Sequence, residues 1–145
     1  MDKAIAKTPE SLRAFKIGPQ DTNYFACIAD PISEGVPFTM LVEIYEPGGA
    51  TPPNTHAKAF EHFFILKGTG KGYCDGMQVD LGPGASLLVP PGKEHIVENT
   101  GTDKLYALCT MVPNEGFAEM IHAGHPVELT AEDIAVLTGA AVAPK

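Results

Sequence analysis

Short apolar segments alternate with breaks rich in glycine and proline through the middle of the chain. The segments are rich in β-branched and aromatic residues, and they cover residues 38–45, 63–66, 85–89 and 105–112. Each has the length of a β-strand, and the breaks between them have the composition of turns. The pattern predicts an all-β domain, built as a sandwich or a barrel.

The two ends of the chain differ from this middle part. Residues 1–35 form an N-terminal arm before the first clear strand, although the run 24–29 is itself strand-like. Near the other end, Thr130 and Asp133 have the spacing of a capping box, which predicts a short helix over 131–137. We therefore expect one domain over residues 1–145, with the barrel core over 36–113 and a helical C-terminal segment over 114–145.

Composition is that of an ordinary folded domain. With 145 residues, of which 44% are hydrophobic and 19% charged, the chain is long enough for one continuous core and too short for two domains of ordinary size. The net charge of -8 disfavours binding to nucleic acid or to an anionic membrane surface. We see no signal peptide and no segment of transmembrane length, so the expected location is cytoplasmic.

The cysteines and two of the histidines receive structural interpretations. Cys27, Cys74 and Cys109 form no CxxC pair, so a reducing compartment and buried thiols without a nucleophilic role are expected. His122 and His125 lie after the last predicted barrel strand, in a segment with glycine and proline. We expect them in a solvated loop.

One set of residues at fixed spacings is much more specific than composition. It consists of Gly84, Pro90, Gly92, His95 and Asn99. The glycines and the proline shape turns, and the histidine is expected to project inward. This set matches the second sequence motif of the cupins at every fixed position, so the chain resembles the cupin superfamily.

The first cupin motif is present only in part. Gly48, Glu61 and Gly68 stand at its positions, and His56 takes the place of its second histidine. Asn54 stands where the motif has its first histidine. The chain therefore resembles a cupin that has lost one metal-binding side chain.

The resemblance implies a double-stranded β-helix, which is a jelly-roll-like antiparallel barrel, with one divalent transition metal inside it. It implies His56, Glu61 and His95 as the metal ligands. Two imidazoles and one carboxylate suit Fe(II), which is our first choice, and also Mn(II), Zn(II), Ni(II) or Cu(II). Asn54 is expected as a weak ligand or as a residue that holds a bound water.

His62 is an alternative ligand because it directly follows Glu61. Side chains alternate along an extended strand, so only one of these two residues can face the barrel interior. The spacing to Gly68 favours Glu61. His62 is then a surface or interface residue, unless a bulge turns it inward.

Several functions are compatible with such a site. The leading hypothesis is a metal-dependent enzyme that acts on a small oxygenated organic molecule by oxygenase-type chemistry, as a dioxygenase or other oxidoreductase does. Glu61 is its candidate catalytic residue, as a general base once substrate displaces it from the metal. Metal-assisted isomerase or lyase chemistry is an alternative. Two others are a non-catalytic small-molecule-binding cupin and a metal-free site that uses His56 and Glu61 as acid and base.

The expected partners follow from the same picture. We expect Phe63, Ile65 and Val97 to line the pocket, which favours an apolar or aromatic substrate over a phosphorylated sugar. Many single-domain cupins pair through barrel faces and N-terminal strands, so the resemblance implies a homodimer.

Overall fold

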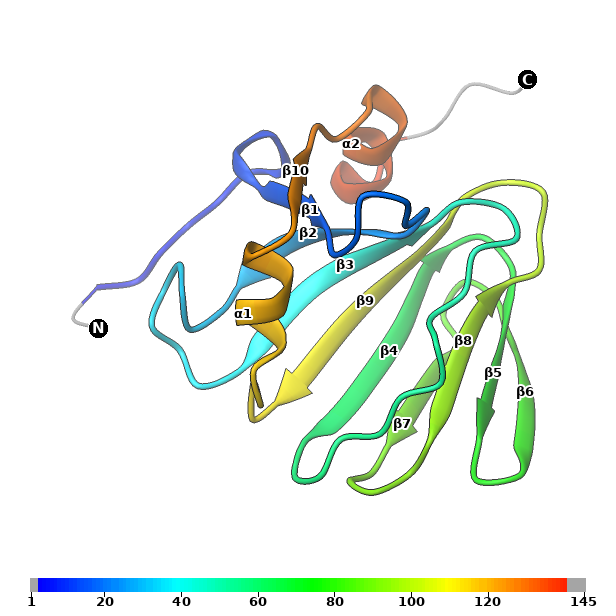
Figure 1. Cartoon of the computed structure of the whole chain (residues 1–145). Coiled ribbons are helices and arrows are strands. Elements are labelled where there is room, and N and C mark those ends of the chain that lie inside the picture. The colour runs from blue at the N-terminus through cyan, green and yellow to red at the C-terminus, as the bar shows by residue number, and fades with distance from the viewer. Residues whose placement is uncertain (1–2, 141–145) are drawn as a thin grey trace.

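Two antiparallel sheets face each other in the computed structural model, which describes residues 3–140 (Figure 1). The larger sheet has seven strands in the order β10-β1-β2-β3-β9-β4-β7, and the smaller has three in the order β6-β5-β8. The strands are β1 Arg13–Lys16, β2 Tyr24–Ala29, β3 Thr39–Tyr45, β4 Phe60–Lys67, β5 Gly70–Cys74, β6 Met77–Leu81, β7 Ser86–Val89, β8 His95–Asn99, β9 Leu105–Val112 and β10 His125–Val127. The predicted all-β barrel architecture is confirmed.

The apolar segments read from the sequence became β3, β4, β7 and β9, and the strand-like run before them became β2. The β5–β6 hairpin was not predicted because glycine and polar residues dominate it. Its turn contains Asp75 with φ 53° and Gly76 with φ 77°. Two consecutive positive φ angles define the tight turn that Asp-Gly sequences favour in hairpins.

Residues before the barrel core also belong to the large sheet. β1 and β2 pair with each other and continue the sheet beyond β3, and β10 closes it with Ala14 opposite Val127. The segment treated as an N-terminal arm in the sequence thus contributes two strands of this chain's own sheet.

The large sheet is covered on both faces. The main core lies between the sheets, whereas a second cluster on the outer face contains Tyr24, Ala26, Val42, Ile44 and Tyr106. Helix α2, Ala131–Thr138, supplies Val136 and Leu137 to this second cluster. The predicted capping box at its start is confirmed.

One correction concerns His122, which we expected in a solvated loop. It ends helix α1, Phe117–His122, and its side chain is only 9% exposed. Its ring lies 4.8 Å from that of Phe15, so the histidine packs against β1. His125 is exposed as expected but begins strand β10 rather than lying in a loop, and the three cysteines are buried and unpaired as expected. No helix in residues 3–140 is long and apolar enough to cross a membrane.

A buried carboxylate fastens α2 to the sheet. Asp133 is 0% exposed and accepts hydrogen bonds of 2.6 Å from the hydroxyls of Tyr24 and Tyr106. The ammonium of Lys104 lies 3.4 Å from the same carboxylate. These contacts compensate the loss of hydration that burial imposes on the charge.

We predict that Asp133→Ala strongly destabilises the fold, because it removes the acceptor of the Thr130 amide in the capping box and leaves two buried hydroxyls without an acceptor. The expected loss in the free energy of unfolding is about 2–4 kcal/mol. Urea denaturation measures it, with Glu132→Ala on the same first turn as the control. A loss in Asp133→Ala no larger than in the control would contradict this role.

Candidate metal centre

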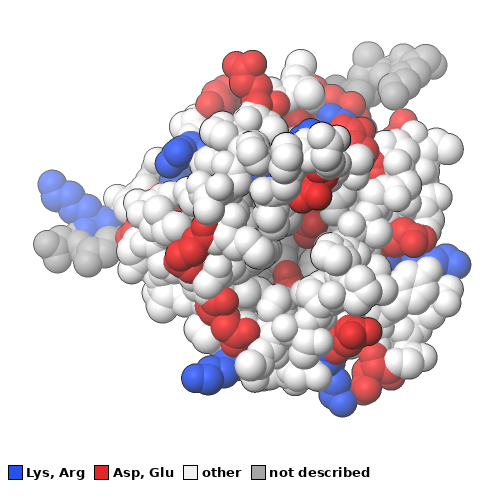
Figure 2. All heavy atoms as spheres, in the orientation of Figure 1, with Lys and Arg blue, Asp and Glu red and all other residues white. Residues whose placement is uncertain are grey.

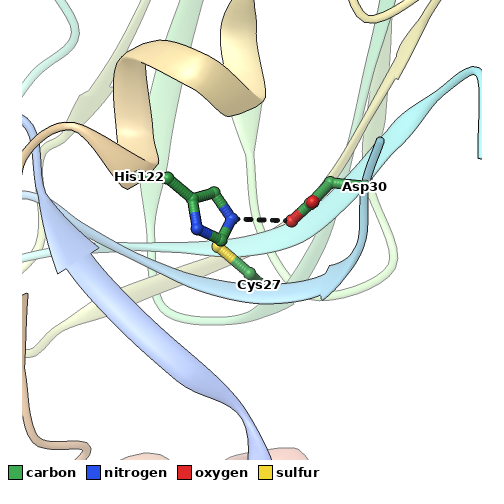
Figure 3. Close-up of side chains that lie close together, drawn as sticks. All are labelled: Cys27, Asp30 and His122. Atoms are coloured by element: carbon green, nitrogen blue, oxygen red, sulfur yellow. Dashed lines mark hydrogen bonds and ion pairs between the residues drawn. The ribbon is translucent and has the colours of Figure 1, made fainter. Parts of the chain in front are cut away.

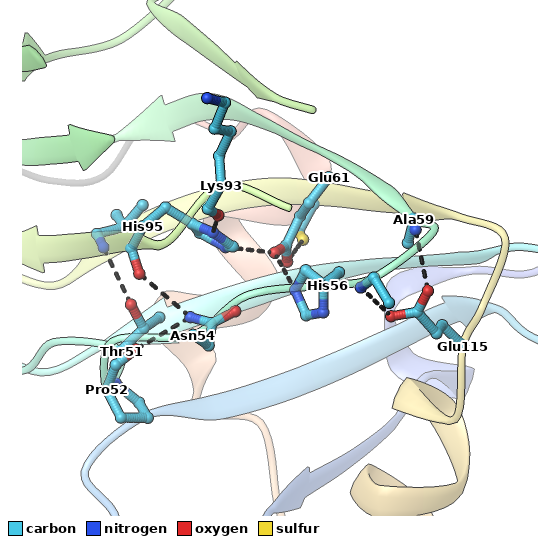
Figure 4. A network of polar contacts seen from close by, with 12 residues as sticks. Thr51, Pro52, Asn54, His56, Ala59, Glu61, Lys93, His95 and Glu115 are labelled. Atoms are coloured by element: carbon cyan, nitrogen blue, oxygen red, sulfur yellow. Dashed lines mark hydrogen bonds and ion pairs between the residues drawn. The ribbon is translucent and has the colours of Figure 1, made fainter. Parts of the chain in front are cut away.

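Three ionisable side chains meet inside the barrel, between the two sheets (Figure 4). The Nε2 atoms of His56 and His95 lie 3.0 and 2.8 Å from the same oxygen, Oε1 of Glu61. Glu61 is 4% exposed and His95 1% exposed, while His56 is partly exposed. The structure therefore brings together the three residues that the motifs single out.

The three side chains come from different parts of the fold. Glu61 is the second residue of β4, and His95 is the first residue of β8. His56 lies on the connection between β3 and β4, which runs beside β8 and forms a bridge between Asn54 and His95. The amide of Gly92 donates to the carbonyl of His56 at 2.7 Å, which fixes the connection two residues further on.

The tautomer of His95 is fixed by its other ring nitrogen. Nδ1 lies 3.1 Å from the carbonyl oxygen of Lys93, and a carbonyl only accepts, so Nδ1 carries a proton. A bare Nε2 lone pair would repel the Glu61 oxygen at 2.8 Å. Because the pKa of Glu61 is lowered to about 2 and its carboxyl is ionised, the contact needs a positive charge, supplied by a proton on Nε2 or by a metal ion bound to both atoms.

Hydrogen bonding decides the charge of Glu61. Burial alone would raise its pKa, but hydrogen bonds from His56, His95 and Cys109 outweigh burial and lower the pKa to about 2. The thiol of Cys109 donates to Oε2 at 3.0 Å, which leaves Oε1 to the two imidazoles. Glu61 is thus a carboxylate at neutral pH, the form that binds cations.

The donor set and its dimensions fit a divalent transition metal. Bonds of about 2.0–2.2 Å place neighbouring ligand atoms of an octahedral ion about 3 Å apart, close to the separations seen here. The Nδ1 contact of His95 to a backbone carbonyl is the outer hydrogen bond that metal-binding histidines usually make. His56, Glu61 and His95 can therefore hold an ion with coordination positions open on one side.

A second carboxylate fixes the short loop between His56 and Glu61. Glu115 accepts hydrogen bonds from the backbone amides of Ala57, Lys58 and Ala59 at 3.0, 2.6 and 3.1 Å. Glu115 follows β9 in the sequence, so the loop is anchored by a residue from a distant part of the chain. Glu115 was not singled out in the sequence, because its partners are backbone groups and leave no pattern of residue types.

Asn54 borders the cluster without contacting Glu61. Its amide nitrogen donates to the carbonyl of Pro52 at 3.0 Å and lies 3.4 Å from that of His95. Figure 4 shows its amide oxygen on the side of His56 and Glu61. This orientation is compatible with either role expected for Asn54, direct binding of an ion or binding of its water.

His62 lies on the opposite face of β4, half-buried, with Leu88 of β7 and Thr110 of β9 as its neighbours in register. The bulge in the pairing of β4 with β9 falls between Ile65 and Lys67, after His62. Strand alternation therefore holds at this point, and His62 lies away from the cluster.

The cluster opens into a cavity of about 470 Å³. Figure 2 shows this face of the molecule hollowed near its centre, with acidic side chains visible inside. Phe63 lines the cavity as expected, and the unexpected apolar residues of its wall are Ile17, Phe25, Phe117 and Met120. Ile65 and Val97 correct the expectation, because both are fully buried in the main core and do not line the cavity.

The cavity wall also carries an acidic group that sequence reasoning missed. Glu43 is 3% exposed, lies in the middle of β3 and accepts a hydrogen bond from the amide of Asn23 at 3.2 Å. Burial, and then the charge of Glu61, raises the pKa of Glu43 to about 8. A charged residue within an otherwise apolar strand was the available signal.

The fold and the cluster define a small antiparallel β-barrel protein with a two-histidine, one-carboxylate candidate metal centre. Residues 41–111 match the family described as the cupin domain. The chain belongs to the cupin superfamily.

Similarity to curated proteins covers only part of each. The chain is 40% identical over 63 residues to a mannose-1-phosphate guanylyltransferase of Escherichia coli, which is 43% of this chain and 13% of that protein. It is 29% identical over 82 residues to an uncharacterised protein of Methanocaldococcus jannaschii, of which the match covers 66%. The chain thus spans a small part of the guanylyltransferase.

Solved structures agree in fold. A predicted oxalate decarboxylase from Thermotoga maritima superposes with a TM-score of 0.67 at 19% identity, over 75% of this chain and 99% of that one. An RmlC-like cupin from Shewanella frigidimarina has a TM-score of 0.67 at 15% identity, over 80% of this chain and 96% of that one.

We predict that Glu43→Gln gains stability relative to the wild type as the pH rises. Between the two pKa values, Glu43 is protonated in the folded state and ionised in the unfolded state. Its contribution to stability is therefore fully present at low pH and decreases as the pH rises. This contribution to the free energy of unfolding is lost between about pH 4.5 and pH 8, by at most about 1.4 kcal/mol per pH unit. The glutamine side chain of the variant cannot ionise, so the variant escapes this loss.

Urea denaturation with EDTA at pH 5 and pH 8 measures the effect as a change in the stability difference between variant and wild type. Glu94→Gln, at an exposed position, is the matched control and should show a difference that is constant with pH. A constant difference for Glu43→Gln as well would mean that the Glu43 carboxyl is not held neutral.

Proposed function

We propose that this chain is a metal-dependent enzyme that acts on a small oxygenated organic molecule. The observation that carries the proposal is the convergence of two imidazole nitrogens on one carboxylate oxygen, at 3.0 and 2.8 Å, beside a cavity of about 470 Å³. These separations are close to those between neighbouring ligand atoms of a bound ion. Fold alone does not carry it, since the same barrel serves many activities.

Oxygenase-type chemistry is the first candidate. His56, Glu61 and His95 would hold a redox-active ion such as Fe(II), and the ion would supply open positions for substrate and O2. The chain supplies the surroundings: Phe63, Phe117 and Met120 form an apolar part of the cavity wall beside the cluster. An aromatic or partly apolar substrate fits such a wall.

The charge of the cavity narrows the substrate class. Of the described residues that line it, none is a lysine or an arginine. A phosphorylated substrate would have only the ion as a counter-charge, while the negative charge of Glu61 lies nearby. The lining therefore favours a neutral molecule, or a single carboxylate or enolate whose oxygen meets the ion.

Isomerase or lyase chemistry is the second candidate, and Glu43 is the observation that favours it. Its carboxyl lines the cavity together with Glu61, and burial, followed by the charge of Glu61, raises its pKa to about 8 in the metal-free protein. A carboxylic acid with such a pKa can donate a proton to a substrate oxygen or carbon. Proton transfer needs no O2, which separates the two candidates experimentally.

The homodimer expected from the sequence stays a prediction, and sedimentation of the purified chain tests it. Exposed apolar side chains on the outer face of β4 and β7, namely Phe60, Phe64 and Leu88, are compatible with it.

We predict that the wild type, loaded with Fe(II) without oxygen, binds nitric oxide in place of O2 and shows the high-spin EPR signal of that adduct. His95→Ala should lose the signal because it removes a buried ligand. His62→Ala is the matched control, since His62 lies on the opposite face of the sheet and should not affect the signal. Absence of the signal in folded, iron-treated wild type would refute an open iron site.

Turnover is then tested with catechols, 1,3-diketones and aromatic hydroxy acids. Uptake of O2 by the wild type but not by His95→Ala supports the oxygenase. Exchange of substrate hydrogen with solvent, without O2 uptake, supports isomerase or lyase chemistry and overturns the first candidate. Ligand binding without either reaction identifies a binding module, and turnover that survives EDTA identifies metal-free acid–base catalysis with His56 and Glu61.

We predict that Asn54→His tightens Mn(II) binding about tenfold, because imidazole is a better ligand than an amide. Asn54→Ala is the companion variant and should bind Mn(II) more weakly than the wild type. The EPR signal of free Mn(II) measures both affinities. Equal affinities in all three proteins would place residue 54 outside the coordination sphere.

A further inference from the structure

A second group of metal-binding side chains lies away from the barrel centre, between β2 and helix α1. Cys27 is on β2, Asp30 follows that strand, and His122 ends α1. One ligand atom from each residue lies within 4.8 Å of the other two. Figure 3 shows the three side chains directed at one another, with the Cys27 sulfur facing the His122 ring.

The carboxylate of this group is held in place by the backbone. Oδ1 of Asp30 accepts hydrogen bonds from the amides of Ile32 and Ser33 at 2.9 and 2.8 Å. Its other oxygen, Oδ2, lies 2.9 Å from Nε2 of His122. One oxygen is therefore fixed by the loop, and the other is presented to the imidazole, as in carboxylates that orient a metal site.

The thiol is the member without a partner. Cys27 is 5% exposed, and within residues 3–140 its sulfur makes no hydrogen bond. Burial, and then the charge of Asp30, raises its pKa to about 12, so without a cation it is a neutral thiol beside a carboxylate. A cation would change that balance, since a coordinated thiol loses its proton.

We propose that Cys27, Asp30 and His122 form a second cation site, with a preference for Zn(II). Thiolate, imidazole and carboxylate are the three ligand types of zinc sites, and thiolate and carboxylate together neutralise the two charges of the ion. Binding forms bonds from zinc to the Cys27 sulfur, to Nε2 of His122 and to Oδ2 of Asp30. The thiol proton is released to solvent, and the proton that Nε2 shares with Asp30 is released to solvent or taken up by Nδ1 of the same ring. A tetrahedral ion separates nitrogen and oxygen ligands by about 3.3 Å, so the His122–Asp30 contact opens by a few tenths of an ångström.

The site differs from the barrel centre in its chemistry and in its consequence. A sulfur ligand selects softer ions than two histidines and a glutamate do. An ion bound at Cys27, Asp30 and His122 would join helix α1 to strand β2. Helix α1 also carries Phe117 and Met120, which line the cavity. The proposal stands independently of any activity at the barrel centre, because it shares no residue with that cluster.

Co(II) titration tests the proposal, because thiolate bound to Co(II) gives a charge-transfer absorption band in the near ultraviolet that nitrogen and oxygen ligands lack. We expect the band in the wild type and its complete loss in Cys27→Ser. It should persist in Cys74→Ser and in Cys109→Ser, which keep Cys27. Zn(II) should abolish the band at one equivalent per site, because it binds more tightly than Co(II).

Two results would overturn the proposal. Loss of the band in Cys109→Ser rather than Cys27→Ser would assign the thiolate to the barrel centre, and absence of any band in wild type saturated with Co(II) would exclude a thiolate site. Cys27→Ser changes one atom, and a melting temperature equal to that of the wild type in EDTA would show that folding is intact. His95→Ala should keep the band, which separates this site from the proposed function.

Discussion

The contact on which this protein depends is the carboxylate oxygen of Glu61 shared by two imidazole nitrogens at 2.8 and 3.0 Å. A buried carboxylate is costly unless positive charge and hydrogen bonds surround it. Here the compensation comes from β8 and from the β3–β4 connection, whereas the carboxylate belongs to β4. The two sheets can therefore close the barrel only in the register that brings these partners together, so the fold and the site share one constraint.

The surrounding backbone holds this register. Gly68 ends β4 with φ 99°, and a Cβ there would lie 2.6 Å from the carbonyl oxygen of Lys104, so no other residue fits. Gly92 has φ 80° and donates to the carbonyl of His56. Glu115 anchors the intervening loop through three amides. The motif glycines thus act on the cluster through chain geometry, while Glu115 acts through hydrogen bonds.

What the sequence could predict follows from which interactions leave a pattern. Fixed spacings located the three cluster residues, and strand alternation placed His62 on the outer face. Ile65 lies on the same face of β4 as Phe63, two residues further along the strand, and is fully buried in the main core. Side-chain alternation predicts which face of a strand a residue lies on, but not whether it borders the cavity. His122 was misjudged because its partners, Phe15 and Asp30, are distant in sequence and contact it only after folding.

Glu43 and Glu61 show how one cavity can hold two carboxyl groups in different states. The hydrogen bonds to Glu61 outweigh its burial, and Glu61 is ionised, whereas burial and the charge of Glu61 outweigh the hydrogen bonds to Glu43, which keeps its proton near pH 7. Such opposite shifts are typical of acid and base pairs. An ion bound at Glu61 would reduce the negative potential felt by Glu43 and lower its proton affinity. Cation binding and proton release from Glu43 are therefore thermodynamically linked, although the two groups lie on different strands.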